Sequence, residues 1–391
     1  DSHFAAEQAS GEIRAICESL FQLLYSQTIA IVQILSTSQA CKEAAMSSSS
    51  PRILIVRLTA VGDVIHGMPV ACALRDAFPN ATLGWGVEGG GGDLLEGHPA
   101  IDHLIRVPRR WWKSLRTIRT AGKQLRALEF DTTVDLQCLT KSAVLAKFSG
   151  ARRRLGAGGK SAREISGWLN NELTVVKADH VVDLYLGILK PLGITQPEVR
   201  FDMPEREVDG QFADSVLQEL SLPAKQYVVL NPGAGWNSKL WPAERYGEIA
   251  KRLFERFGVR SLAVWGGQEE LAMAETIVRT SDRAAMLAPS TSLRELSALL
   301  RRARLFIGSD TGPMHLAVAV DTPAVSLHGT SRAEWCGAYG ASNRRVQAYY
   351  QEGSAKERRS AENTAMRAIT VEDVFVAASE LLEADELRRC G

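Results

Sequence analysis

The segment GSDTGPMHLA, residues 308–317, gathers an acid, a hydroxyl, two glycines, a proline and a histidine directly after the apolar run 305–307. Asp310 is predicted to end a buried strand, and Pro313 suits the first turn of a helix. The free N–H groups at such a helix start bind anions. His315 follows Asp310 by five residues, so the two side chains could form a catalytic pair. The alternative is a turn that binds an anion. No nucleophile elbow accompanies the segment, which argues against a hydrolase triad.

A second acid lies in RLTAVGDVIHGMP, residues 57–69. Asp63 follows a predicted strand, in a loop expected to lead to a helix at 69–78. An exposed aspartate is ionised at neutral pH, so it could act as a base or orient a hydroxyl. It could equally be only a helix cap. Gly62 allows the backbone to approach a ligand closely.

A glycine-rich loop follows a later strand in NPGAGWNSKLWP, residues 231–242. Its backbone N–H groups and the next helix start favour an anion, and Lys239 adds a point charge that suits phosphate. The Walker pattern is absent. An ordinary strand-to-helix turn remains the alternative.

Two basic clusters are PRRWWKSLR at 108–116 and ARRRLG at 151–156. The first could bind an anionic acceptor or a phosphorylated headgroup, or be a solvated helix face. The second is interpreted as a surface loop, with acceptor contact as the alternative. Because the net charge is only +1, we expect no nucleic-acid partner.

The architecture follows from the alternation of elements. Strands are predicted at residues 51–56, 81–88, 101–108, 131–137, 227–233, 261–267, 305–310 and 324–329. Helices are predicted at residues 69–78, 111–129, 180–193, 242–257, 269–280, 292–302, 313–319 and 370–384. This predicts an α/β protein with two Rossmann-like, doubly wound parallel-sheet domains facing across a cleft. Ligands should bind at the carboxyl ends of the strands.

Length and composition agree with that reading. The 391 residues exceed one ordinary core, and 45% hydrophobic with 23% charged residues is typical of a globular enzyme. The six cysteines show no CxxC or metal-ligand spacing, which favours a reducing compartment and no metal site. Residues 1–50 are expected to be a poorly ordered extension, with folding from near Met46. An amphipathic membrane-surface helix is the alternative there.

Together, the segments at 57–69, 231–242 and 306–329 resemble the heptosyltransferases of glycosyltransferase family 9. The likeness covers about residues 51–340, and RRWWK at 109–113 and DLQCLTKSA at 135–143 add to it. It implies the GT-B fold and inverting, metal-independent transfer of heptose from ADP-heptose to a Kdo-type sugar of the lipopolysaccharide inner core. No cofactor is implied. The implied location is cytoplasmic, with peripheral contact at the inner membrane allowed.

The resemblance also implies roles and boundaries. Residues 51–205 would form the acceptor domain, 206–340 the donor domain, and 341–391 a polar loop with a C-terminal helix. The implied catalytic residues are Asp63 as general base and Lys239 at the donor phosphate. The implied donor-binding residues are Gly62, Ala234, Gly235, Glu269 or Glu270 at the ribose, Asp310, Thr311, Gly312 and His315. The implied acceptor-binding residues are Arg109, Arg110 and Lys113.

The donor loop departs from the family, because Ala234-Gly235-Trp236 stands where hydroxyl and basic residues are typical. Another nucleotide sugar is therefore an alternative. A nucleotide-sugar epimerase on the same fold, or a non-catalytic sugar-binding descendant, would also fit the architecture.

Overall fold

The computed structural model describes residues 50–390. The first half of the protein, residues 52–187, is built around one parallel sheet in the order β3-β2-β1-β4-β5-β6. Its strands are β1 (Arg52–Val56), β2 (Thr82–Glu88), β3 (His103–Val107), β4 (Thr132–Asp135), β5 (Arg153–Ala157) and β6 (Glu172–Thr174). Every strand pair in it is parallel.

The second half, residues 207–390, repeats this plan in the order β12-β11-β10-β7-β8-β9. Its strands are β7 (Tyr227–Asn231), β8 (Arg260–Ala263), β9 (Ala285–Leu287), β10 (Leu305–Ser309), β11 (Ala324–Leu327) and β12 (Arg344–Val346). In both sheets the strand order therefore reverses at an inner pair of neighbouring strands. This pair is β1 and β4 in the first sheet and β7 and β10 in the second. The predicted α/β fold of two doubly wound parallel sheets is confirmed.

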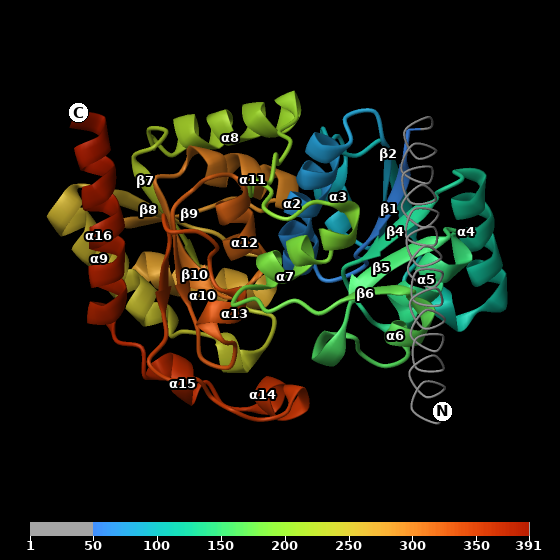
Figure 1. The fold of residues 1–391 in the computed structure, drawn as a ribbon. Coiled ribbons are helices and arrows are strands. Elements are labelled where there is room, and N and C mark those ends of the chain that lie inside the picture. Colours follow the sequence, from blue (N-terminus) through green and yellow to red (C-terminus); the bar gives the residue numbers. More distant parts are fainter. Residues whose placement is uncertain (1–49, 391) are drawn as a thin grey trace, which may run out of the picture. The chain divides into compact units, whose positions relative to one another are not determined.

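Helices cover both faces of each sheet (Figure 1). Those of the first half are α2 (Val61–Ala77), α3 (Gly91–Leu95), α4 (Leu115–Ala127), α5 (Thr140–Phe148), α6 (Ser166–Leu169) and α7 (Val181–Gly187). Those of the second half are α8 (Glu207–Glu219), α9 (Ala243–Phe257), α10 (Gln268–Thr280), α11 (Leu293–Arg302), α12 (Gly312–Ala319), α13 (Ala333–Cys336), α14 (Ala355–Ser360), α15 (Thr364–Arg367) and α16 (Val371–Cys390). Single 3₁₀ turns are η1 (Trp111–Lys113), η2 (Gly159–Ser161), η3 (Lys190–Leu192) and η4 (Asn237–Lys239).

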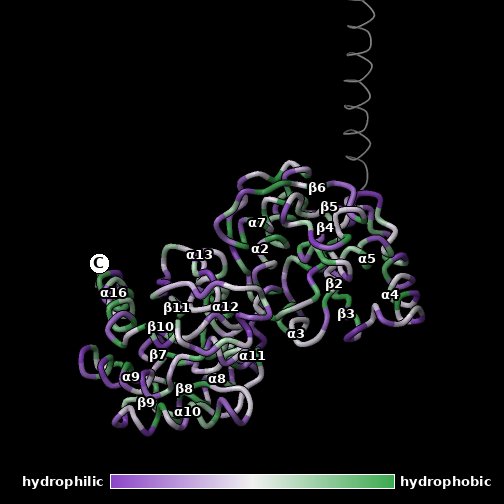
Figure 2. The backbone as a smooth tube through the Cα atoms, turned by 90° about the horizontal axis from the view of Figure 1, so that it is seen from below, coloured by the Kyte–Doolittle hydropathy of each residue, from purple (hydrophilic) through white to green (hydrophobic). Residues whose placement is uncertain are grey.

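The largest hydrophobic core lies between the two sheets and joins the halves. It contains Ile65 and Leu74 of α2 together with Leu299 of α11 and Leu316 of α12, all buried. Helix α2 packs against α12, and α3 against α11 (Figure 2). Separate cores lie under α4 and α5 on one outer side and under α9, α10 and α16 on the other. Because apolar burial stabilises in proportion to area, the middle core fixes the two halves against each other.

The sequence prediction of α2 was wrong at its start. The helix begins at Val61 and contains Asp63 and Pro69, so the acid is in the first turn of a helix and not in a loop. Proline inside a helix costs a hydrogen bond. Every residue from Val64 to Leu74 is buried, and this burial offsets that cost.

Two further segments differ from expectation. The basic segment at 151–156, interpreted as a surface loop, contains most of β5, where Leu155 is fully buried. The stretch 341–365, expected to be irregular, contains β12 and α14 and begins α15. The two strands β5 and β12 are short, and pairing with β4 and β11 provides backbone hydrogen bonds that their own sequence pattern does not predict.

Between the halves, the described chain crosses once, through residues 188–206 after α7 and before α8. The expectation for residues 1–49 lies outside the described part of the chain. Among the helices of the described residues, none is long and apolar enough to cross a membrane.

Candidate active site

The carboxyl ends of β1, β7 and β10 lead into one cavity of about 520 Å³. Helix α2 contributes from the first half, and the loop after β7, the turn after β10 and helices α13 and α14 contribute from the second. The predicted residues that line it are Gly62, Asp63, Gly235, Lys239, Asp310, Thr311, Gly312 and His315. The three motifs thus share one site, although Asp63 and His315 are about 250 residues apart in the sequence. Ligand sites of doubly wound sheets lie at the carboxyl ends of the strands, where these motifs were expected.

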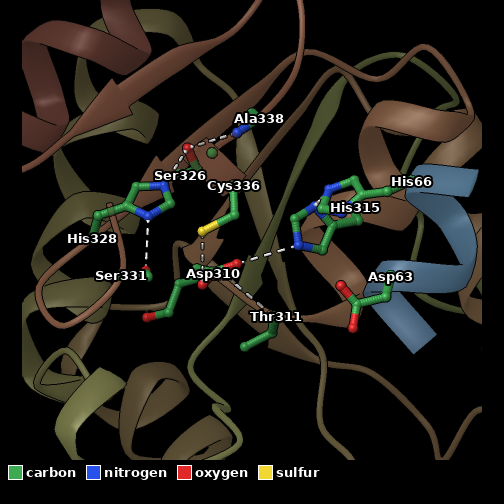
Figure 3. A network of polar contacts seen from close by, with 12 residues as sticks. Asp63, His66, Asp310, Thr311, His315, Ser326, His328, Ser331, Cys336 and Ala338 are labelled. Atoms are coloured by element: carbon green, nitrogen blue, oxygen red, sulfur yellow. Dashed lines mark hydrogen bonds and ion pairs between the residues drawn. The ribbon is translucent and has the colours of Figure 1, made fainter. Parts of the chain in front are cut away.

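Asp63 is held on one of its two carboxylate oxygens. Its Oδ2 lies 2.5 Å from Nη2 of Arg57 and accepts the N–H of Ala60 at 3.1 Å. The Arg57 side chain is only 9% exposed, whereas that of Asp63 is 40% exposed. Figure 3 shows the Asp63 carboxylate pointing from α2 toward Asp310 and Thr311. The acid is therefore oriented by a buried cation and presented to the cavity.

Asp310 is the centre of a buried polar network. Its Oδ2 lies 2.6 Å from Lys239 Nζ, and its Oδ1 lies 3.2 Å from His315 Nε2. Burial alone would raise the pKa of the Asp310 carboxyl, but the hydrogen bond with His315 and the charge of Lys239 outweigh it and hold that pKa well below its ordinary value. The anticipated contact between Asp310 and His315 is present, and it is shared with Lys239.

The network continues into the first half. His315 Nδ1 lies 3.0 Å from Nε2 of His66, which follows Asp63 by three residues, a little less than one turn of α2. Because ionised Asp310 only accepts, His315 Nε2 carries the proton of that contact. Burial, followed by the nearby imidazoles of His315 and His180, lowers the pKa of His66 well below its ordinary value. His66 is thus a neutral ring that links the two halves at the cavity.

His328 and Cys336 complete the surroundings of Asp310 (Figure 3). Asp310, His328 and Cys336 offer ligand atoms within 4.8 Å of one another, the geometry of a potential metal site. Both ring nitrogens of His328 already contact hydroxyls, of Ser331 at 3.1 Å and of Ser326 at 3.0 Å. Burial raises the pKa of the Cys336 thiol, and that thiol donates to Oδ2 of Asp310 at 3.5 Å. In this arrangement Cys336 is hydrogen-bonded to Asp310, and His328 is hydrogen-bonded to the two serines.

The structure distinguishes Glu269 from Glu270. Neither residue lines the cavity. The Glu270 carboxylate accepts the N–H of Gly266 at 2.7 Å. It also lies so close to Gly233 that a side chain at position 233 would collide with the Glu270 carboxylate. Burial raises the pKa of Glu270. Glu269 is exposed. Glu270 is thus the acid beside the loop after β7, while Ala234 lies in that loop outside the cavity lining.

The basic residues expected on the acceptor side, Arg109, Arg110 and Lys113, are exposed beyond β3 and do not line this cavity. They connect to it indirectly. The backbone N–H of Arg110 donates to Glu88 at 2.8 Å, and Glu88 pairs with Lys141 at 3.2 Å. Lys141 in turn donates to Thr59 at 3.0 Å, at the start of the turn that leads into α2.

Among the side chains around the cavity that were not predicted from the sequence are Arg57, His66, Arg358 and Arg359. Arg57 and His66 lie within the segment singled out for Asp63. A helix starting at Val61 would have placed His66 on the same face as Asp63, three residues on. The two arginines of α14 come from a segment without any recognised pattern.

Comparison with known proteins agrees with this architecture. The family model of glycosyltransferase family 9 (heptosyltransferase) matches residues 118–366. Lipopolysaccharide heptosyltransferase 1 of Pseudomonas aeruginosa is 31% identical over 300 residues, covering 74% of this chain and 82% of that protein. The E. coli K12 enzyme of the same name is 28% identical over 299 residues, covering 74% and 91%.

Solved structures give the same fold. E. coli heptosyltransferase WaaC with ADP superimposes with a TM-score of 0.67 at 25% identity, covering 84% of this chain and 99% of that one. A family 9 glycosyltransferase from Veillonella parvula gives a TM-score of 0.75 at 24% identity over 86% and 98%. Two Rossmann-like halves around a shared cavity are the GT-B arrangement, and the protein is a glycosyltransferase. The chain belongs to glycosyltransferase family 9, the heptosyltransferase family.

Proposed function

We propose that the protein transfers heptose from ADP-heptose to a Kdo-type sugar of the lipopolysaccharide inner core, with inversion at the anomeric carbon and without a metal ion. The observation that carries this proposal is the shared cavity, in which an oriented carboxylate from one half meets a cationic, anion-binding turn from the other. Its relatives are named lipopolysaccharide heptosyltransferases, and WaaC was solved with ADP. Transfer at the cytoplasmic face of the inner membrane fits such an acceptor.

In this proposal Asp63 is the general base. It takes the proton of the acceptor hydroxyl while that oxygen forms its bond to the anomeric carbon, and the bond from that carbon to the diphosphate oxygen breaks. ADP leaves with the electron pair, so one displacement inverts the centre. The support is that both contacts of Asp63 use Oδ2, one of them to buried Arg57. A base held in this way is pre-oriented for proton transfer.

The leaving diphosphate is assigned to the second half. Lys239 supplies charge, and the N–H groups at the start of α12, around Thr311 and Gly312, supply donors. Asp310 and His315 position Lys239 through the network described above. Gly62, Ala234 and Gly235 border the donor, and Glu270, rather than Glu269, is assigned to the ribose because of its place beside Gly233.

The acceptor is assigned to the first half, residues 51–205, and the donor to residues 206–340. Arg109, Arg110 and Lys113 would bind anionic groups of the acceptor glycolipid beyond the cavity. The exposure of these three side chains supports contact with a large ligand. Lys141, which contacts both Glu88 and Thr59, would couple the position of the bound acceptor to the turn before α2.

The test measures ADP release by the purified protein from ADP-heptose, with and without a Kdo-lipid A acceptor, beside UDP- and GDP-sugars. Acceptor-dependent release of ADP is expected. Asp63→Asn should reduce turnover about 100-fold or more while donor binding persists. Asp93→Asn, an exposed acid paired with Arg106 outside the cavity, is the matched control. Absence of ADP release in the presence of the acceptor would refute the substrate assignment.

A further inference from the structure

Helix α14 forms part of the cavity wall. Ala355, Arg358 and Arg359 line the same cavity as Asp63 and Lys239. The helix packs beside η4, the 3₁₀ turn that carries Lys239. A segment near the C-terminus thus returns to the ligand site after the strands of the second sheet are complete.

This return is fixed on both sides of α14. Before it, the N–H of Gln351 donates to the carbonyl of Gly329 at 2.9 Å. After it, Asn363 Nδ2 donates to the carbonyl of Leu240 at 2.8 Å. Both partners are neighbours of the cavity, so the position of α14 beside it is part of the fold.

Charge at the cavity is unevenly compensated. Lys239 is paired with Asp310 at 2.6 Å. In contrast, Arg358 and Arg359 form no ion pair with any carboxylate of the described residues. The neighbouring Glu357 turns to its own helix start, where it accepts the N–H of Ser354 at 2.7 Å. The net positive charge facing the cavity therefore resides on the two arginines.

Each arginine is held in place while keeping donors available. The Arg359 guanidinium lies 4.6 Å from the ring centroid of Trp236, a residue of the loop after β7 that is itself 39% exposed. Cation–π contact fixes a guanidinium without using its N–H groups. Arg358 donates through Nη1 to the carbonyl of Thr330 at 2.8 Å, and its buried Nε has no acceptor among the described residues.

We propose that Arg358 and Arg359 bind the diphosphate of the nucleotide-sugar donor and, with Lys239, neutralise it as it leaves. The inference rests on the proposed function, because it takes the donor to be a nucleotide diphosphate sugar. A planar guanidinium binds two phosphate oxygens at once, which a lysine cannot do. The three cations then surround the leaving group from η4 and α14.

The experiment measures binding of ADP, UDP, inorganic pyrophosphate and adenosine to the full chain by calorimetry. Arg358→Ala and Arg359→Ala should each weaken ADP binding about 10- to 100-fold and leave adenosine binding unchanged. Lys356→Ala is the matched control, because Lys356 is an exposed cation of the same helix outside the cavity lining. Arg358→Lys keeps the charge if Arg358→Ala fails to fold.

The outcomes separate the two proposals. If wild-type protein binds ADP and the arginine variants bind it equally well, the assignment to α14 is overturned and the proposed function stands. If ADP-heptose is no substrate but UDP or pyrophosphate binds and is lost in the variants, the donor assignment fails and the arginine site stands. If wild-type protein binds none of these diphosphates, both are overturned.

Discussion

His66 of α2 lies 3.0 Å from His315 of α12, ring nitrogen to ring nitrogen, and this contact joins the two halves of the protein inside the candidate active site. The two ring planes are inclined by 70°, with centroids 4.1 Å apart. Because His315 also contacts Asp310, the position of the network around Lys239 is coupled to the helix that carries Asp63.

Replacing His66 by leucine should therefore affect both stability and the site. His315 Nδ1 would remain buried without a partner, at a cost of about 1–3 kcal/mol. Urea unfolding measures that loss, and the KM for the donor should rise. His103→Ala on β3, outside the cavity, should leave both quantities unchanged. An unchanged free energy of unfolding in the His66 variant would contradict the structural role of the contact.

The buried histidines predict a loss of stability in mild acid. Burial is the largest cause that lowers the pKa of both His180 and His328 to about 4, and His66 lies well below its ordinary value. In the unfolded chain each ring takes up a proton near pH 6.5, so between about pH 6.5 and 4 the unfolded state binds more protons and the free energy of unfolding falls as pH decreases.

Urea denaturation at several pH values across that window tests this. The loss should reach a few kcal/mol by pH 4.5. Asp135 and Glu270, whose pKa values are raised by burial, act in the opposite direction near the acid end. A His328→Gln variant should show a shallower slope than the parent protein. A stability that stays flat from pH 7 to 5 would show that these rings are not buried in the neutral form.

Variants of the Lys239–Asp310 ion pair can distinguish an effect on stability from an effect on nucleotide binding. Lys239→Met leaves a carboxylate that is 9% exposed without its lysine partner, and should destabilise the fold by about 2–4 kcal/mol. Adding Asp310→Asn removes the unpaired charge and should restore most of that stability. Nucleotide binding should stay lost in the double variant. Thermal unfolding and calorimetry on Lys239→Met, Asp310→Asn and the double variant provide the comparison, and additive destabilisation would argue against a coupled pair.

Gly62 tests how closely α2 and α12 approach at the site. A Cβ there would lie 2.5 Å from Cδ2 of the His315 ring, so Gly62→Ala must displace one helix or the ring. Turnover should fall at least about tenfold, with a destabilisation of about 1–3 kcal/mol. Gly90→Ala is the matched control, since its backbone is helical and no atom lies within 4 Å of the added carbon. Full activity in Gly62→Ala would mean that the contact is not needed.

Much of the fold could be predicted because the long buried strands carry their own signal. Runs such as 51–56 and 305–310 are apolar and rich in β-branched residues, and their alternation with amphipathic helices such as α9 defines parallel sheets. Strands β6 and β12 have three residues each, and β5 begins with two arginines. Their pairing depends on neighbours in space, which no local pattern reveals.

Which residues of the two halves lie together could be predicted in part, for a similar reason. Residues at strand ends, such as Lys239 and Asp310, are brought together by topology, so their motifs were sufficient. The contact of His66 with His315 depends on how the two halves pack, and the wall formed by α14 depends on the path of the C-terminal segment. The start of α2 was predicted at Pro69, because proline is common in the first turn of a helix. In the structure the helix begins at Val61, and Pro69 lies in its interior.

Residues 188–206 are the only backbone that crosses between the halves within the described chain, and each half keeps a complete six-stranded sheet. A cut in that crossing would leave two polypeptides held by the α2–α12 and α3–α11 interfaces, with no strand removed from either sheet. The protein is therefore suited to assembly from two separately expressed fragments. By the same logic, a chimera of two relatives needs a single junction. Under the proposed assignment of acceptor and donor to the two halves, one splice would combine one partner's donor preference with the other's acceptor preference.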